Sequence, residues 1–257
     1  MKYDKHTYKL ILESAISAGY TFVDYLSVDF SKGKQIILRH DIDYSPEMAL
    51  EMAIIDASYK ISSTFAVLLS SPLYNPFTPQ NISFINEIHS LGHNIALHIR
   101  CLNEREISQE IEKEMQIMKY IFPYIQPVFI WHNLTKNNLL SHINVPNMVN
   151  AYDTKFTQEM HYISDSVLIR HTPEEFLSLM GKYDLIHLLL HPIIWIAERN
   201  NMVAMISHTL IRIIRGLDKK FSPNRAWKEK FPNGLPEQIL EKIDEIIIEG
   251  TPCEMKR

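Results

Sequence analysis

The chain has 257 residues and contains little of what marks several classes of protein. Its two cysteines, Cys101 and Cys253, form neither a C-x-x-C pair nor a disulfide framework. No run approaches the roughly 18 uninterrupted apolar residues that a membrane span requires. The N-terminus shows no long apolar segment and no small-residue cleavage site of the kind that a secretory signal carries. We therefore expect a soluble, cytoplasmic protein with no membrane span.

Sequence motifs of several functional classes are missing too. There is no P-loop and no G-x-G-x-x-G, which argues against a nucleotide cofactor. There is no G-x-S-x-G elbow, and Cys101 has no evident set of orienting partners for a nucleophile. The net charge is −4, and the basic residues are scattered among acidic ones, so no nucleic-acid partner is expected. Nothing indicates an oligomer, although a dimer face is a minor alternative to core packing for the helix at 197–217.

Short apolar segments alternate with longer stretches of helical periodicity. Strand signals lie at 36–38, 63–69, 93–98, 127–131 and 185–190, with shorter candidates near 147–152 and 161–164. Helix signals follow Ser45-Pro46, Thr78-Pro79 and Thr172-Pro173, and also cover 104–122 and 197–217. A loop rich in proline, asparagine and glycine is expected at 221–236, followed by a last helix that ends at Gly250. This alternation predicts parallel strands joined by helical crossovers, in an open doubly wound sheet or an incomplete barrel. We expect one domain over 1–257, with its core at about 36–196 and a helical extension at about 197–257.

Histidine and aspartate recur where these strands end. The residues concerned are His40, Asp41 and Asp43 after the first strand, His98 after the third, His132 after the fourth and His191 after the last. The carboxyl ends of parallel strands gather at one edge of a sheet or barrel, where ligands bind. Asp41 and Asp43 are two apart, so they share one face of an extended segment. A divalent cation would offset the cost of burying both carboxylates, and aspartate with histidine suits zinc or another first-row metal.

Single members of this pattern have structural interpretations as well. One histidine at a strand end is more often a hydrogen-bonded structural residue than a metal ligand, and Asp41-x-Asp43 alone is equally compatible with a helix cap or a turn. His93 lies at the entry of its strand, on the opposite rim, and His187 lies within one, so both are expected to be structural. The joint pattern favours a metal site more than any of its members does.

Three strings in this order resemble a known family. They are RHDID at 39–43, LGHNIALH at 91–98 and LLLHP at 188–192, with Tyr152-Asp153 and 162–166 between them. They resemble the polysaccharide deacetylases (carbohydrate esterase family 4), and most closely a bacterial subgroup found with surface-polysaccharide synthesis genes. The resemblance covers about residues 36–196. It implies a distorted (β/α)7 barrel of the NodB-like fold and metal-assisted hydrolysis of an N-acetyl amide on a sugar.

The resemblance also implies roles for individual residues. By position, Asp41 is similar to the catalytic base and His191 to the general acid, whereas Asp43 and His98 are similar to metal ligands. The roles of the two aspartates are open to exchange, because here one residue separates acids that the family usually has adjacent. The divalent metal implied is most often zinc.

The sequence departs from the family pattern at the third ligand. The family's second metal histidine would fall at Leu102, and an aspartate common in the subgroup would fall at Arg100. We expect His132, at a neighbouring strand end, to replace the missing histidine. The residues that we expect to support the site or contact substrate are His40, Asp165, Trp131, Tyr162 and Trp195.

Three functional hypotheses follow. The first is a metal-dependent hydrolase that removes an N-acetyl group from a sugar or glycan precursor. The second is a hydrolase on the same fold that cleaves the C–N bond of another small amide or ureide. The third is a catalytically retired relative that binds a glycan without a metal. The leucine at 102 favours this third hypothesis, and the joint retention of Asp41, Asp43, His98 and His191 opposes it.

Overall fold

The structure is a computed structural model that describes residues 1–100, 106–132, 142–166, 171–199, 201–237, 239–242 and 245. Cys101, Leu102 and Cys253 lie outside these described residues, as does most of the helix expected before Gly250. The chain forms two compact units, residues 1–196 and 197–257, which are described separately below.

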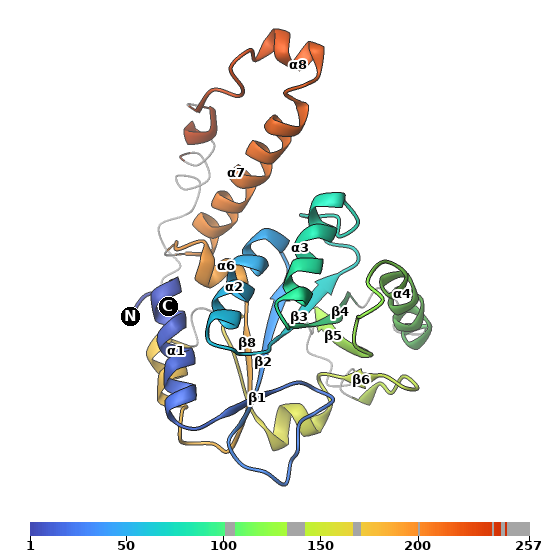
Figure 1. Ribbon diagram of the computed structural model, residues 1–257, viewed down its shortest axis with the longest axis vertical. Coiled ribbons are helices and arrows are strands. Elements are labelled where there is room, and N and C mark those ends of the chain that lie inside the picture. The colour runs from blue at the N-terminus through green and yellow to red at the C-terminus, as the bar shows by residue number, and fades with distance from the viewer. Residues whose placement is uncertain are drawn as a thin grey trace. The chain divides into compact units, whose positions relative to one another are not determined.

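A parallel sheet forms the centre of the first unit (Figure 1). Its strands are β1 (Thr21–Val23), β2 (Gln35–Ile42), β3 (Thr64–Leu68), β4 (Asn94–Arg100), β5 (Val128–His132), β6 (Val149–Asn150), β7 (His161–Ser164) and β8 (Leu185–Leu190). The order along the sheet is β6-β5-β4-β3-β2-β8-β7, with β1 paired to β2 off this path. Strands β2 to β8 thus follow one another in chain order around a ring that is open between β6 and β7, among the described residues. The predicted distorted (β/α)7 barrel is confirmed.

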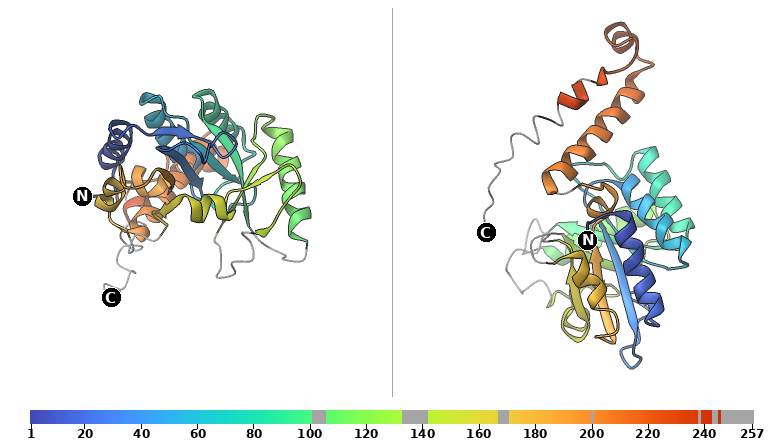
Figure 2. Two further views of the ribbon diagram at one scale, coloured as in Figure 1. Left: turned by 90° about the horizontal axis from the view of Figure 1, so that it is seen from below. Right: turned by 90° about the vertical axis from the view of Figure 1, so that its left-hand side faces the viewer.

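Helices cover the outer side of this sheet (Figure 2). The residues at their N-termini explain where they begin. The helices are α1 (Lys5–Ser17), α2 (Pro46–Ser58), α3 (Pro79–Ser90), α4 (Ile107–Ile121), α5 (Pro173–Ser178) and α6 (Pro192–Ile196). Ser45 accepts a hydrogen bond from the Met48 N–H, and Thr78 accepts one from the Asn81 N–H. Each cap precedes a proline in the first turn, where a missing N–H costs no helical hydrogen bond. The expected caps at Ser45 and Thr78 are therefore confirmed.

Alternation along the strands separates two cores. The outer core joins Phe65, Leu97, Phe129 and Trp131 to apolar residues of α2, α3 and α4. The inner core contains Ile37, Ala66, Ala96, Val128 and Ile130, together with Phe156 from a π-helix at Lys155–Glu159. Because successive side chains of a strand point to opposite faces, residues an even number of positions beyond these inner residues on the same strand also face inward. Asp41, His98 and His132 stand at such positions.

The second unit contains α7 (Met202–Phe221) and α8 (Arg225–Lys230). Asn201 caps α7 by accepting a hydrogen bond from the Ala204 N–H, and Asn224 caps α8 by accepting one from the Trp227 N–H. The long helix was expected over 197–217, and α8 lies within a segment expected to be a loop. No helix of the described residues is long and apolar enough to cross a membrane.

Candidate metal centre

Three potential metal ligands meet at the carboxyl ends of β2, β4 and β5. Asp43 follows β2, His98 lies in β4, and His132 is the last residue of β5. Asp43 Oδ1 lies 3.1 Å from His98 Nε2 and 3.2 Å from His132 Nδ1. The two ring nitrogens lie 3.2 Å apart. One carboxylate oxygen and two imidazole nitrogens within this distance form a donor set that fits zinc or another first-row divalent metal.

The backbone hydrogen bond of His98 turns its other ring nitrogen into this cluster. His98 Nδ1 donates to the Ile130 carbonyl oxygen over 3.0 Å, which leaves Nε2 as the ring nitrogen that faces Asp43. Metal-binding histidines commonly have this arrangement, because the backbone bond fixes both the tautomer and the ring orientation. Burial raises the pKa of Asp43, but hydrogen bonds from His132 and His98 outweigh it and hold the pKa well below its usual range. Asp43 is therefore a carboxylate, as metal binding requires.

Asp41 lies beside the cluster as a firmly held carboxylate. Arg39, two residues earlier on the same strand, donates from Nε to Asp41 Oδ1 over 2.7 Å and from Nη2 to Oδ2 over 2.5 Å. Both side chains are buried, and Asp41 Oδ2 is 3.5 Å from His98 Nε2. Burial raises the pKa of Asp41, but the charges of Arg39 and His98 outweigh it and lower the pKa. Arg39 lies in the string RHDID, but no role was predicted for it. Its spacing of two residues from Asp41 is the signal that identifies it.

His191 faces the cluster from the end of β8 and is oriented by Asp165. Its Nε2 lies 3.6 Å from Asp43 Oδ2, and its Nδ1 lies 2.5 Å from Asp165 Oδ1. The other Asp165 oxygen accepts hydrogen bonds from the His191 backbone N–H at 2.9 Å and from Trp195 Nε1 at 2.7 Å. Burial lowers the pKa of His191, but Asp165 and then Asp43 and Asp41 raise it more, to about 9. At neutral pH the ring is therefore the cationic imidazolium, with a proton on both nitrogens.

The remaining candidate residues divide between the site and the protein core. Trp131 is in the outer core beside Phe129, so it does not reach the inner face. Trp195 is fully buried in α6, and its indole N–H donates a hydrogen bond to Asp165. Tyr162 is half-buried on the inner side, with its ring centre 5.0 Å from that of His187. The structure therefore brings neither tryptophan into position to stack on a sugar.

His40 points to the outer side and belongs to a different cluster. Its Nδ1 bonds to the Leu190 carbonyl oxygen at 3.2 Å and its Nε2 to Asp56 Oδ2 at 3.0 Å. Asp56, in α2, also accepts hydrogen bonds from Tyr8 and from Ser63. His93 completes this cluster through Ser63, as expected for a structural histidine. The structure does not bring His40 to the candidate metal centre.

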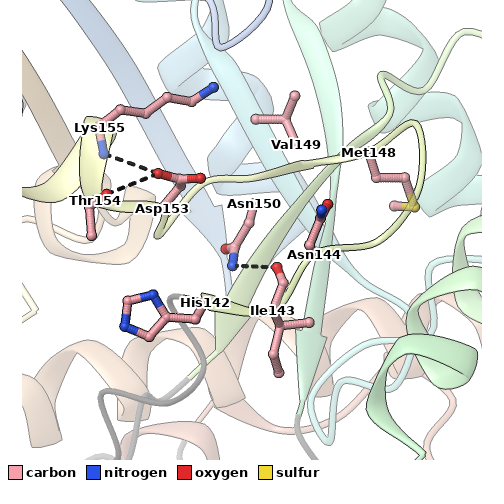
Figure 3. Close-up of a pocket in the computed structure, with 9 residues that line it drawn as sticks. All are labelled: His142, Ile143, Asn144, Met148, Val149, Asn150, Asp153, Thr154 and Lys155. Carbon is pink, nitrogen blue, oxygen red and sulfur yellow. Dashed lines mark hydrogen bonds between the residues drawn. The ribbon is translucent and has the colours of Figure 1, made fainter.

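A separate cavity of about 370 Å³ lies around β6 (Figure 3). Its lining includes Asn150, Asp153 and Lys155, and none of its residues belongs to the Asp43 cluster. Asn150 Nδ2 donates to the Ile143 carbonyl oxygen, and Asp153 Oδ1 accepts from the Lys155 N–H. These polar groups therefore support the surrounding backbone. The cavity is not part of the candidate metal centre, because its lining contains none of the three potential ligands.

The chain was compared with protein-family models, curated proteins and solved structures, and only solved structures match it. No protein-family model matches the chain, and no curated protein matches it. A Bdellovibrio bacteriovorus peptidoglycan deacetylase matches at 16% identity with a TM-score of 0.43, over 84% of this chain and 56% of its own. A CE4 family pseudoenzyme from Bacillus anthracis matches at 15% identity with a TM-score of 0.41, over 62% of this chain and 55% of its own. The chain thus spans little more than half the length of these structures.

Proposed function

We propose that the protein is a metal-dependent hydrolase that removes an N-acetyl group from a sugar or glycan precursor. The observation that supports this most is the convergence of Asp43, His98 and His132 between a held carboxylate and a protonated histidine. This set contains a place for a cation, a proton acceptor and a proton donor, which are the parts that hydrolysis of an amide requires.

Asp43, His98 and His132 would hold the cation, for which zinc fits the donor set best. When bound, a cation of this kind polarises a carbonyl group and lowers the pKa of a water molecule to about 7. Asp43 contacts both histidines, which supports the role of metal ligand for this residue. Arg39 already binds both oxygens of Asp41, so Asp41 is less suited to be a ligand, and the role of base is left to it. The exchange of roles between the two aspartates is therefore less well supported.

Asp41 and His191 would divide the proton transfers between them. Asp41 is ionised and would accept a proton from the attacking water. His191 is protonated at Nε2 and would donate that proton to the amide nitrogen, which cannot leave as an anion. Asp165 fixes the ring, since it accepts a hydrogen bond from the Nδ1 of His191. Positioned acid–base groups of this kind accelerate reactions by about 10²–10⁴-fold.

Metal content and acetate release test this proposal together. We expect near-stoichiometric zinc or another first-row metal in the wild type, and its loss in His98→Ala and in His132→Ala. His191→Ala should retain the metal and lose acetate release from N-acetyl sugars. A wild type that binds no metal after reconstitution would contradict the proposal. A metal-bound wild type that releases no acetate from any N-acetyl sugar would instead direct the search to other small amides and ureides.

We further propose that this hydrolase works in the cytoplasm, the location expected from the sequence, on a soluble or lipid-linked precursor. The sequence predicts residues 1–257 to be a single deacetylase-like domain with a helical extension. Limited proteolysis followed by the activity assay tests that organisation, because a second independent domain would separate from the first without loss of activity.

A further inference from the structure

The second unit contains a basic segment that the total charge conceals. Residues 199–230 include eight lysines and arginines but only two acidic residues, Asp218 and Glu229, which gives a net charge of +6. The whole chain has a net charge of −4, so the remaining residues have a net charge of −10. The excess of positive over negative charge thus lies in α7, α8 and their immediate flanks.

Four lysines of this segment are exposed and available to a partner. Lys219 and Lys220 lie in the last turn of α7, and Lys228 and Lys230 lie in α8. All four are exposed, and no ion pair is recorded for them among the described residues. The two acidic residues of the segment have other partners, since Asp218 accepts a hydrogen bond from Trp227 Nε1 and Glu229 pairs with Arg225. The lysines therefore keep a positive field at the surface of these helices.

Apolar side chains run along the same helix. Ile206, Leu210, Ile213 and Leu217 follow each other at intervals of three or four residues, which places them on one face of α7, and none of them is fully buried. At the end of this stripe Leu217 is 45% exposed and Phe221 is 44% exposed.

Aromatic rings extend this stripe into α8. The ring centre of Trp227 lies 5.5 Å from that of Phe221 and 5.0 Å from that of Phe231. Trp227 is half-buried, and its polar Nε1 is satisfied by Asp218. Exposed apolar and aromatic groups therefore lie close in sequence to the four lysines.

We propose that the segment of α7 and α8 binds the surface of a membrane that contains anionic lipids. Helices that bind such surfaces combine an apolar face, which enters the headgroup boundary, with lysines that attract anionic headgroups. Aromatic rings with a polar edge are favoured at that boundary. The net charge of +6 is complementary to the anionic lipid headgroups. The apolar face can be buried at the headgroup boundary, which a partner bound by charge alone would not provide. This proposal is independent of the proposed hydrolysis.

Vesicle flotation of the full chain tests the proposal. We expect binding to vesicles of phosphatidylcholine mixed with phosphatidylglycerol, and little binding to phosphatidylcholine alone. Each lysine near an anionic surface strengthens partitioning about fivefold, so a variant with Lys→Gln at positions 219, 220, 228 and 230 should bind at least about a hundredfold more weakly. Binding by the wild type should also weaken steeply at about 1 M salt, where the Debye length falls to about 3 Å.

A matched control variant has Lys→Gln at exposed Lys2, Lys9, Lys113 and Lys119, which changes the total charge equally. It should bind the mixed vesicles as the wild type does, and circular dichroism should show all variants folded. The proposal is overturned if the wild type does not bind the mixed vesicles, or if both variants lose binding equally. It is also overturned in favour of a second copy if sedimentation shows a dimer that the segment variant abolishes while no vesicle binding occurs.

Discussion

The barrel sheet carries a histidine–carboxylate cluster on each of its faces, and the two clusters are built from similar residues. On the outer face, Asp56 accepts hydrogen bonds from His40, Tyr8 and Ser63, and both nitrogens of His40 have protein partners. On the inner face, the nitrogens of His98 and His132 converge on a single oxygen of Asp43. The outer cluster is saturated by the protein itself, whereas the inner one presents several donor atoms to one point. This difference distinguishes a structural histidine from a candidate ligand better than its place at a strand end does.

The strongest test of this comparison replaces the carboxylate of each cluster by alanine, in two separate variants. Asp43→Ala should lower metal affinity by about a thousandfold or more, because one ligand contributes a substantial part of a binding free energy of about 10–16 kcal/mol. Titration with zinc, followed by elemental analysis, measures this. Asp43→Ala that binds zinc as tightly as the wild type would show that the inner cluster is structural.

Asp56→Ala should have the opposite phenotype. It removes a fully buried carboxylate and leaves His40, Tyr8 and Ser63 without their acceptor, and loss of such a buried polar partner destabilises proteins by about 3–5 kcal/mol. Denaturant unfolding measures the loss, and metal content in the fraction that stays folded should be unchanged. Ser63→Ala is a milder control, since it removes only one hydrogen bond to Asp56, with an expected loss of about 1 kcal/mol. Loss of metal in a folded Ser63→Ala variant would mean that the two clusters are coupled.

A third variant tests whether Asp165 orients His191. Asp165→Asn should lower the rate of acetate release by about 10²-fold while metal is retained. Because the acid must be protonated, activity falls as pH rises through the pKa of His191, which Asp165 helps to raise to about 9. Without that carboxylate the pKa falls, so the declining limb of the pH profile should move to lower pH.

Trp195→Phe is a control for Asp165→Asn, because it removes the indole N–H that donates to the same carboxylate, together with part of the buried ring, and keeps the carboxylate itself. It should lower activity less and leave the limb close to that of the wild type. An unchanged profile in Asp165→Asn would show that Asp165 only stabilises the fold around His191.

Much of this arrangement follows from the sequence, because strand ends are readable from apolar runs. Once Asp41, His98 and His191 are placed at the ends of parallel strands, one edge of the barrel must collect them. His132 was predicted for the same reason, although its distance from Asp43 depends on the path of β5. Alternation alone predicted parallel strands in an open doubly wound sheet or an incomplete barrel, and the resemblance to the deacetylase family favoured the barrel. The opening between β6 and β7 depends on strands of only two and four residues.

Other assignments required side-chain direction, which spacing along the chain determines only within a strand. His40 and Trp131 each adjoin a site residue, and adjacent strand residues face opposite sides, so the pleat directs both outward. Trp195 follows the strand in α6, a helix that the sequence analysis did not predict, and its bond to Asp165 joins residues 30 apart. Similarly, the description of the basic residues as scattered among acidic ones was wrong for residues 199–230, whose net charge of +6 is concealed by the total of −4.

A smaller effect is expected from Glu114 of α4, a carboxylate of the outer layer that lacks the partners of Asp56. Burial raises the pKa of Glu114, and Glu110 one turn earlier adds to it, so that the pKa reaches about 7 instead of the ordinary 4.5. The folded state therefore binds more protons than the unfolded state between these values, and stability falls as pH rises through this window. Solvent screening reduces the penalty to roughly 1 kcal/mol.

Glu114→Gln removes this ionisation and keeps the shape of the side chain. The variant should be about 1 kcal/mol more stable than the wild type at pH 8, where the penalty is complete, and nearly equal to it at pH 4, where Glu114 is protonated in both states. Urea unfolding at the two pH values measures the difference. An equal gain at both would assign the effect to helix propensity. A stability difference that appears only at high pH would instead establish that a carboxylate on the outer face lowers stability unless, like Asp56, it is fully paired.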